Sequence, residues 1–365
     1  MLMPHVFRAL CTAILAIALV PRFAFAAWPK SPYTNLPLCT AANIQSSPTI
    51  VSDGAGGAIV TWHDARSGTN YDIYAQHVLA SGAVDPAWPA DGRALCTAAN
   101  HQWDPTIVSD GAGGAIVTWH DGRSGTNNDI YAQHVLASGA VDPAWPEDGR
   151  ALCTAAYSQY YPTIVSDEAG GAIVTWEDGR SGTNDDIYAQ HVLASGAVDP
   201  AWPADGRALC TAAYHQSTPT IVSDGSDGAI VTWHDDRSAS WDIYAQHVLA
   251  SGAVDPAWPA DGRALCTAAN DQWDATIVSD GAGGAIVTWY DGRSGTNDDI
   301  YAQHVLASGA VDPAWPADGR ALCTAANDQW DATIVSDGAG GAIVTWYDGR
   351  SGTNDDIYAQ HVLAS

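Results

Sequence analysis

The chain is built from six copies of one unit of about 57 residues. Successive copies of one cysteine lie 57, 57, 57, 56 and 57 residues apart, at Cys39, Cys96, Cys153, Cys210, Cys266 and Cys323. A D-I-Y-A-Q-H-V segment recurs six times in phase with these cysteines, and residues 264–308 and 321–365 are identical. A fixed period of this length indicates a repeat architecture, in which each unit is one supersecondary structure packed against its neighbours.

Each unit contains four strand-like runs. In one copy, residues 106–109, 115–119, 130–136 and 151–155 form these runs, and connections rich in Gly, Asp and Pro separate them. Four short strands per unit, repeated six times, are typical of propeller blades. We therefore predict an all-β fold, a single six-bladed β-propeller with four-stranded blades over residues 27–365.

The two ends of the repeat region complement each other. Residues 28–29 and 38–41 match the end of a third connection and a fourth strand, whereas the sequence stops at Ser365, just after a third strand. The two fragments together complete one blade. We therefore predict a ring closed by pairing of the N- and C-terminal strands, which would also hide the edge strands.

The N-terminus has the features of a secretory signal. Arg8 precedes an apolar run over residues 9–20 that is too short to span a bilayer, and Ala24-Phe25-Ala26 is an A-x-A cleavage pattern. We predict a signal peptide over residues 1–26 and a secreted, cell-surface or periplasmic protein. No other segment is long and apolar enough to be a membrane helix.

The charge balance is strongly acidic, with 41 Asp and Glu against 14 Lys and Arg and a net charge of −27. Such a surface repels phosphate backbones, so nucleic acid is excluded as a partner. It would attract calcium, but most of these residues are Asp beside Gly, Ser or Asn, where turn formation explains them. We expect no cofactor, with calcium as the alternative, and a monomer.

The repeat resembles a group of secreted bacterial β-propeller proteins. The pattern P-x-I-V-S-D-G-x-G-G-A-I-V-x-W-x-D-x-R-S-G, followed by D-I-Y-A-Q, stands at residues 105–125 and 129–133 and recurs over residues 36–365. Its S-D-G portion is also similar to the Asp-box of sialidase-type propellers, but here Ser109 and Asp110 are adjacent and Trp119 lies further on. The resemblance implies the fold, and neither group implies one shared activity.

The repeated Cys, His and Arg residues are predicted to be structural. Equivalent positions on separate blades lie too far apart for a disulfide or a shared zinc ion, so six free thiols and structural histidines are expected. Each copy also carries W-x-D-x-R. This motif is either a carboxylate and cation site, or an Arg that bridges two Asp residues, such as Asp121 and Asp129 around Arg123.

The copies differ from one another mainly on one predicted face. Strands in a blade alternate in direction, so the connections equivalent to residues 100–104 and 121–128 emerge together on what we call the loop face. Those equivalent to residues 110–114 and 137–150 emerge on the opposite turn face and are nearly constant. The residue after the second-strand Trp also varies, as His63, His120, Glu177, His234, Tyr290 and Tyr347.

Aromatic residues are concentrated among these variable positions. Exposed rings beside Asp, Asn and Gln suit stacking on sugars or holding a peptide, and the alternative is drift in tolerant loops with rings that pack between blades. The predicted ligand-binding residues are Trp103, Tyr160, Tyr161, Trp241, Trp273, Trp330, Tyr290, Tyr347 and Glu177.

Nearly interchangeable blades argue against catalysis, because a glycosidase site needs unlike residues from different blades. Glu177 is the one distinctive acid at a variable position, and it has no obvious unique partner. We therefore predict no catalytic residue and a non-catalytic extracellular binding or adhesion scaffold for a glycan, protein or peptide. A sialidase-like glycoside hydrolase is the alternative, and a passive surface protein is the third hypothesis.

Overall fold

The computed structural model describes residues 28–29 and 32–363, so the predicted signal peptide lies outside the described residues. The described part of the chain is all-β, with 23 strands. Within it, no helix has the length and apolar character needed to cross a membrane.

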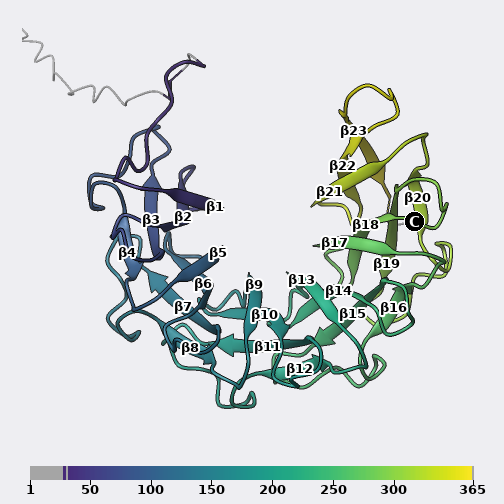
Figure 1. The fold of residues 1–365 in the computed structure, drawn as a ribbon, viewed down its shortest axis with the longest axis horizontal. Coiled ribbons are helices and arrows are strands. Elements are labelled where there is room, and N and C mark those ends of the chain that lie inside the picture. Colours follow the sequence, from purple (N-terminus) through teal and green to yellow (C-terminus); the bar gives the residue numbers. More distant parts are fainter. Residues whose placement is uncertain (1–27, 30–31, 364–365) are drawn as a thin grey trace, which may run out of the picture.

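Each blade contributes strands in the predicted order. The first strands line the inner side of the molecule (Figure 1): β1 (Gln45–Ser52), β5 (Gln102–Ser109), β9 (Gln159–Ser166), β13 (Gln216–Ser223), β17 (Gln272–Ser279) and β21 (Gln329–Ser336). The second strands carry A-I-V-T-W: β2 (Ala58–Asp64), β6 (Ala115–Asp121), β10 (Ala172–Asp178), β14 (Ala229–Asp235), β18 (Ala285–Asp291) and β22 (Ala342–Asp348).

The remaining strands complete the blades outward. The third strands carry D-I-Y-A-Q-H-V: β3 (Asp72–Val78), β7 (Asp129–Val135), β11 (Asp186–Val192), β15 (Asp242–Val248), β19 (Asp299–Val305) and β23 (Asp356–Val362). The fourth strands are short and lie on the outer side: β4 (Arg93–Cys96), β8 (Arg150–Cys153), β12 (Arg207–Cys210), β16 (Arg263–Cys266) and β20 (Arg320–Cys323).

The strands form six antiparallel sheets, five with four strands and a last one, β21-β22-β23, with three. This arrangement is consistent with a six-bladed propeller. Pairing is regular between second and third strands, but every first strand has an irregularity, as between Tyr160 and Thr163 in blade 3. A bulge re-aims the side chains beside it, and here it lies at the inner rim of the molecule.

The hydrophobic core lies between consecutive blades. One cluster joins Ile130 and Trp145 of blade 2 to Val174, Trp176 and other apolar residues of blade 3. Trp176 and its equivalents in blades 2, 4 and 5 are completely buried. Because each blade buries its apolar face against the next, the repeated strand sequences specify the blade-to-blade junctions as well as the blades.

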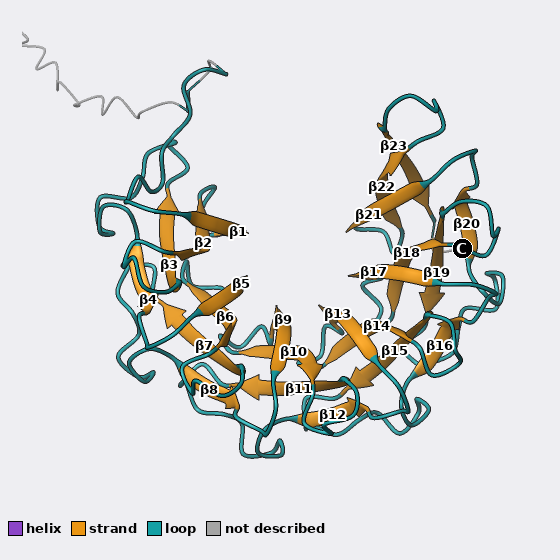
Figure 2. Ribbon diagram, in the orientation of Figure 1, coloured by secondary structure: helices purple, strands orange, loops and turns teal. Residues whose placement is uncertain are grey.

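The two ends of the molecule lie apart, with the blades along an open arc (Figures 1 and 2). The predicted pairing of the terminal strands is not seen, because residues 38–41 form no strand and β23 is exposed from Asp356 to His361.

Candidate functional site

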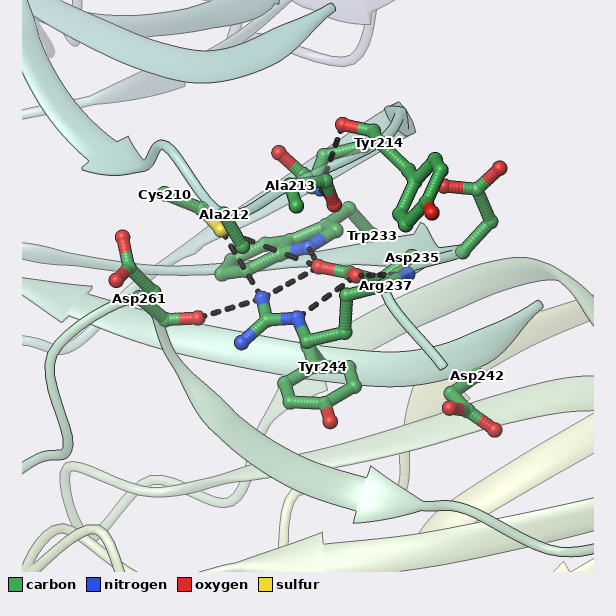
Figure 3. Close-up of polar contacts among 12 residues, drawn as sticks. Cys210, Ala212, Ala213, Tyr214, Trp233, Asp235, Arg237, Asp242, Tyr244 and Asp261 are labelled. Atoms are coloured by element: carbon green, nitrogen blue, oxygen red, sulfur yellow. Dashed lines mark hydrogen bonds and ion pairs between the residues drawn. The ribbon is translucent and has the colours of Figure 1, made fainter. Parts of the chain in front are cut away.

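The W-x-D-x-R motif builds an internal ion pair in each blade, shown for blade 4 in Figure 3. The carboxylate of Asp235 is fully buried, and it accepts hydrogen bonds from the Trp233 indole N–H, at 2.9 Å, and from the Arg237 guanidinium. Arg237 also donates to the carbonyl oxygen of Asp261, at 2.8 Å. The second predicted partner, Asp242, is instead bonded by the hydroxyl group of Ser238. The motif therefore forms an internal ion pair that holds a blade together.

The cysteines belong to the same internal cluster. Arg237 donates to the Cys210 sulfur at 3.0 Å and lies over the ring of Tyr244, 4.0 Å from its centroid. Burial raises the pKa of Cys210 to about 12, so the thiol stays protonated. All six cysteines among the described residues are free, which confirms that prediction.

The repeated histidines form a clamp on the turn face. In blade 3, His191 Nδ1 lies 2.9 Å from Asp199 and Nε2 lies 2.9 Å from Asp167. Burial lowers the pKa of His191, but the hydrogen bonds to these two carboxylates outweigh burial and raise it overall. The clamp joins the two turn-face connections of one blade. Within residues 28–29 and 32–363 no group of three or more His, Cys, Asp or Glu residues is arranged to hold a metal ion.

The inner rim of the loop face is where neighbouring blades differ chemically. At each first-strand bulge one residue has a positive φ: Ser47, Asp104, Tyr161, Thr218, Asp274 and Asp331. Thr218, with a φ of 54°, is β-branched, and a β-branched residue in this region is strained. Such strain is concentrated at functional sites, where the surrounding structure holds it in place.

Glu177 is held by the strained residue of the next blade. The backbone N–H of Thr218 donates to its carboxylate at 2.6 Å, and the Glu177 side chain is buried. Burial raises the pKa of Glu177 to about 7, with a smaller upward contribution from Asp185, while the Thr218 N–H and His215 oppose the shift. A carboxylic acid that is still protonated near neutral pH can serve as a general acid.

A cavity of about 340 Å³ lies at the inner rim, and Thr218, the hydrogen-bond partner of Glu177, lines it. Asp104, Tyr161 and Thr218 line it from three consecutive blades, together with prolines and threonines of β5, β9 and β13. Asp104 and Tyr161 are at least partly exposed. Asp104 therefore lines the cavity directly, whereas the buried Glu177, whose pKa is raised, reaches it through Thr218.

A larger cavity, of about 820 Å³, lies on the turn face between blades 4 and 6. It is lined by the Gly-rich turns, such as Gly281 and Gly338, and by side chains that recur in the other blades. Since nothing in it differs from blade to blade, we place the candidate site at the smaller cavity.

The structure divides the predicted site residues into three groups. Trp103, Tyr160, Tyr161 and Glu177 lie together over blades 2 and 3, and Tyr161 lines the candidate cavity. Trp241 and Trp273 pack together between blades 4 and 5, with ring centroids 5.4 Å apart.

The third group lies towards the end of the arc. Trp330 stacks on Tyr347 at 4.9 Å, and Tyr290 donates from its hydroxyl group to Asp274 at 3.1 Å. Sequence analysis missed Asp104 and Thr218 as site residues. Both occupy the variable position just before the first-strand Pro, which was the available signal.

Comparisons with known proteins identify the fold. No family model and no curated protein sequence matches the chain. An α-L-arabinanase from Penicillium chrysogenum, solved with arabinobiose, superposes with a TM-score of 0.50 at 11% identity, over 90% of this chain and 95% of that chain. An ulvan lyase, from a new family of polysaccharide lyases, superposes with a TM-score of 0.51 at 9% identity, over 87% of this chain and 78% of that chain.

These likenesses correct the prediction of a non-catalytic scaffold. At such low identity they show a shared fold, but in both neighbours this fold carries an enzyme that cleaves polysaccharides. The prediction rested on blades that looked interchangeable in sequence. At the inner rim they are not interchangeable, because Asp104, Tyr161 and Thr218 from successive blades meet at one cavity.

Proposed function

We propose that this protein is a carbohydrate-active enzyme that hydrolyses glycosidic bonds at the inner-rim cavity, with Glu177 as the general acid. The observation that carries the proposal is the raised pKa of Glu177, about 7, together with its hydrogen bond to Thr218, which lines a cavity that Asp104 also lines. Glycoside hydrolysis generally needs one carboxyl group that is protonated and one that is ionised, on either side of the scissile bond.

The side chains at the candidate site suggest a separate role for each of three residues. In the described part of the chain the Glu177 carboxyl group has a single hydrogen-bond partner, the Thr218 N–H, so its other oxygen can carry the proton to the leaving group. Asp104 is the second carboxylate, and it either activates water or attacks the sugar directly. The ring of Tyr161, which is 56% exposed, offers a flat surface on which a sugar can stack.

The electrostatics favour a neutral glycan over an acidic one. Arg residues of the second-to-third-strand loops are bound to buried Asp residues, as Arg180 is to Asp178 at 2.6 Å. Arg residues of the fourth strands contact the next blade, as Arg150 does at the carbonyl oxygen of Gly196. Among the described residues, no basic side chain lines the candidate cavity, so a sialic acid or uronic acid would meet Asp104 without a counter-charge. We place the activity outside the cytoplasm, since residues 1–26 predict export.

The test is turnover by the mature protein on a panel of neutral polysaccharides, with ulvan as a charged comparison, measured by new reducing ends. We expect Glu177→Gln to lose at least about 100-fold in kcat. Glu147→Gln, the same change on an exposed turn-face residue, should leave kcat unchanged. Activity should fall as pH rises through about 7, because Glu177 then loses its proton. If the Glu177 variant retains full activity, the proposal is wrong.

We further propose that the arc closes into a ring through its N-terminal segment. The N-terminal segment contacts blade 1 in the same way that the fourth strand of each blade, with the connection before it, contacts the following blade. A Cβ on Gly82 would lie 2.8 Å from Trp28, as one on Gly139 would lie 2.7 Å from Trp88. Thr40 N donates to Asp91 at 2.6 Å, in the same way that every following blade is joined.

The N-terminal segment therefore lies against blade 1 in the position of a fourth strand, but within the described residues no first, second or third strand precedes it. The last sheet, β21-β22-β23, has the first three strands of a blade and lacks the fourth. Deletion of residues 27–43 should expose the unpaired edge of β23 and cause aggregation or a large loss of thermal stability. A truncated protein as soluble and heat-stable as the full chain would overturn closure.

A further inference from the structure

Aromatic and histidine rings form one continuous series across blades 1 to 3 of the loop face. Each ring contacts the next with centroids 4.8 to 6.2 Å apart, and Trp103 stacks on His101 at an angle of 13°. We call this series the ring track, and its members are His63, Tyr71, His101, Trp103, His120, Tyr160 and Tyr161.

Some rings of the ring track are buried and others are exposed to solvent. His63 and His120 are buried, and burial lowers the pKa of both, so they stay neutral at neutral pH. Tyr71, His101 and Trp103 are partly exposed, while Tyr161 is exposed. Neutral, partly exposed rings in a row suit the apolar faces of successive sugar units.

The ring track connects two cavities. Near its blade 1 end, Tyr71 and His101 line a cavity of about 330 Å³, the outer cavity, together with Asn43, Thr69 and Asn70. The inner end of the track, at Tyr161, is part of the wall of the candidate catalytic cavity. The outer cavity combines rings with amide and hydroxyl groups, which can bind sugar hydroxyls without any charge.

The other blades do not continue the series. In the described residues, the rings of blades 4 and 5 form a separate group around His234, and Trp330 with Tyr347 forms another. In blade 3 the position of Tyr71 is taken by Asp185, which pairs with His215 at 3.0 Å. The ring track is thus confined to one side of the catalytic cavity.

We propose that the ring track binds an extended neutral polysaccharide and leads it from the outer cavity to the catalytic one. The proposal rests on the proposed function for its reaction, but it concerns binding, and it assigns the substrate class as a polymer rather than a short oligosaccharide. Trp103 lies at the middle of the track and contributes most to the recognition of chain length.

Binding is measured in the Glu177→Gln background, so that cleavage cannot remove the ligand. The probes are linear arabinan, galactan, mannan and mixed-linkage β-glucan, each with its disaccharide and hexasaccharide. Trp103→Ala should weaken hexasaccharide binding about 5- to 150-fold and change disaccharide binding by less than about twofold. Trp273→Ala, the equivalent residue of blade 5 and outside the track, should change neither by more than about twofold.

A second pair of variants protects the test against misfolding. Tyr71→Ala removes the outer ring from a surface loop and should also weaken binding of the hexasaccharide alone, whereas Asn128→Ala, the same position in blade 2, should not. Equal losses for both chain lengths, equal losses in Trp103→Ala and Trp273→Ala, or no probe bound at all would overturn the ring track. A chain that binds these probes but never cleaves them would instead overturn the proposed function and leave the track in place.

Discussion

The turn face and the loop face are built from the same six repeats, yet they differ in which residue types adopt a positive φ. On the turn face most positive-φ positions are Gly or Asp, such as Gly111 and Asp148. On the loop face Tyr157, Tyr161 and Thr218 adopt positive φ, although a left-handed conformation costs such residues about 1–2 kcal/mol each. The turn face is therefore relaxed, and the loop face retains strain beside the candidate catalytic cavity.

The difference shows how a repeat protein can acquire a single site. The turn-face clamp and the internal Arg–Asp pair recur in almost every blade and fix the frame. Once the frame is fixed, a substitution at the rim changes local chemistry without disturbing the blade. One Glu at position 177, between histidines at the equivalent positions of blades 2 and 4, is enough to make blade 3 unlike the rest.

The largest effect should come from breaking the turn-face clamp. His191→Ala leaves the nearly buried carboxylates of Asp167 and Asp199 without their partner, so we expect a loss of about 3–5 kcal/mol in unfolding free energy. The control is His215→Ala on the loop face, where the side chain is 47% exposed and pairs with Asp185. That change should cost less than about 1 kcal/mol. Equal losses in denaturant titrations would show that the clamp does not stabilise the frame.

The clamp should also make stability depend on pH, with a defined sign. The pKa of His191 is raised above 6.5, so its contribution is complete below 6.5 and is lost as pH rises through the raised value. The pKa values of Asp167 and Asp199 are lowered below 3.8, so their contribution is present above 3.8 and is lost as pH falls through the lowered values. The melting-temperature difference between the wild type and His191→Ala should therefore peak in mild acid. A difference independent of pH between 3 and 9 would contradict this account.

On the loop face, Glu177 should lower the free energy of unfolding at alkaline pH, whereas the turn-face clamp stabilises the protein. Because the pKa of Glu177 is raised from 4.5 to about 7, the native state binds a proton that the unfolded state has released, and stability falls as pH rises between these values. Glu177→Gln removes that penalty, so at pH 8 the variant should be more stable than the wild type by up to about 3 kcal/mol, with little difference at pH 4. Denaturant titrations at the two pH values measure this. A variant that is less stable at pH 8 would mean that Glu177 is not held in a costly environment.

Local sequence patterns predicted the blades and their two faces well. The strand runs, the Gly-rich turn after Ser109 and the free thiols depend on residues close together in the chain or on exact repetition. The loop-face assignment is supported by contacts between connections, such as the bond from Asn127 to the carbonyl oxygen of Tyr157.

The candidate site depended on contacts between blades, which the repeat pattern does not encode. The raised pKa of Glu177 follows from burial, which outweighs the opposing hydrogen bond from Thr218, 41 residues further on. The ring track needs the spacing of side chains on three blades. The wrong prediction about catalysis followed from treating the blades as equivalent, although only their frames are equivalent.

The smallest effect should come from Glu168, the turn-face position where a residue other than Gly or Asp has a positive φ. Glu168 has a φ of 61°, whereas the equivalent residues of the other five blades are Gly, with φ between 73° and 76°. A Cβ at the equivalent Gly111 would meet no atom within 4 Å, so the cost of Glu168 is backbone strain rather than a clash.

Glu168→Gly should therefore stabilise the protein, but the strain relieved is partly offset by the extra freedom that Gly gives the unfolded chain. We expect a net gain of about 0.5–1 kcal/mol in denaturant titrations, with no change in turnover or in binding of the hexasaccharide probes. The reciprocal change, Gly111→Glu, should destabilise by a similar amount and serves as the control. If Glu168→Gly instead impaired turnover, the turn face would also take part in function, and the distinction between the two faces would fail.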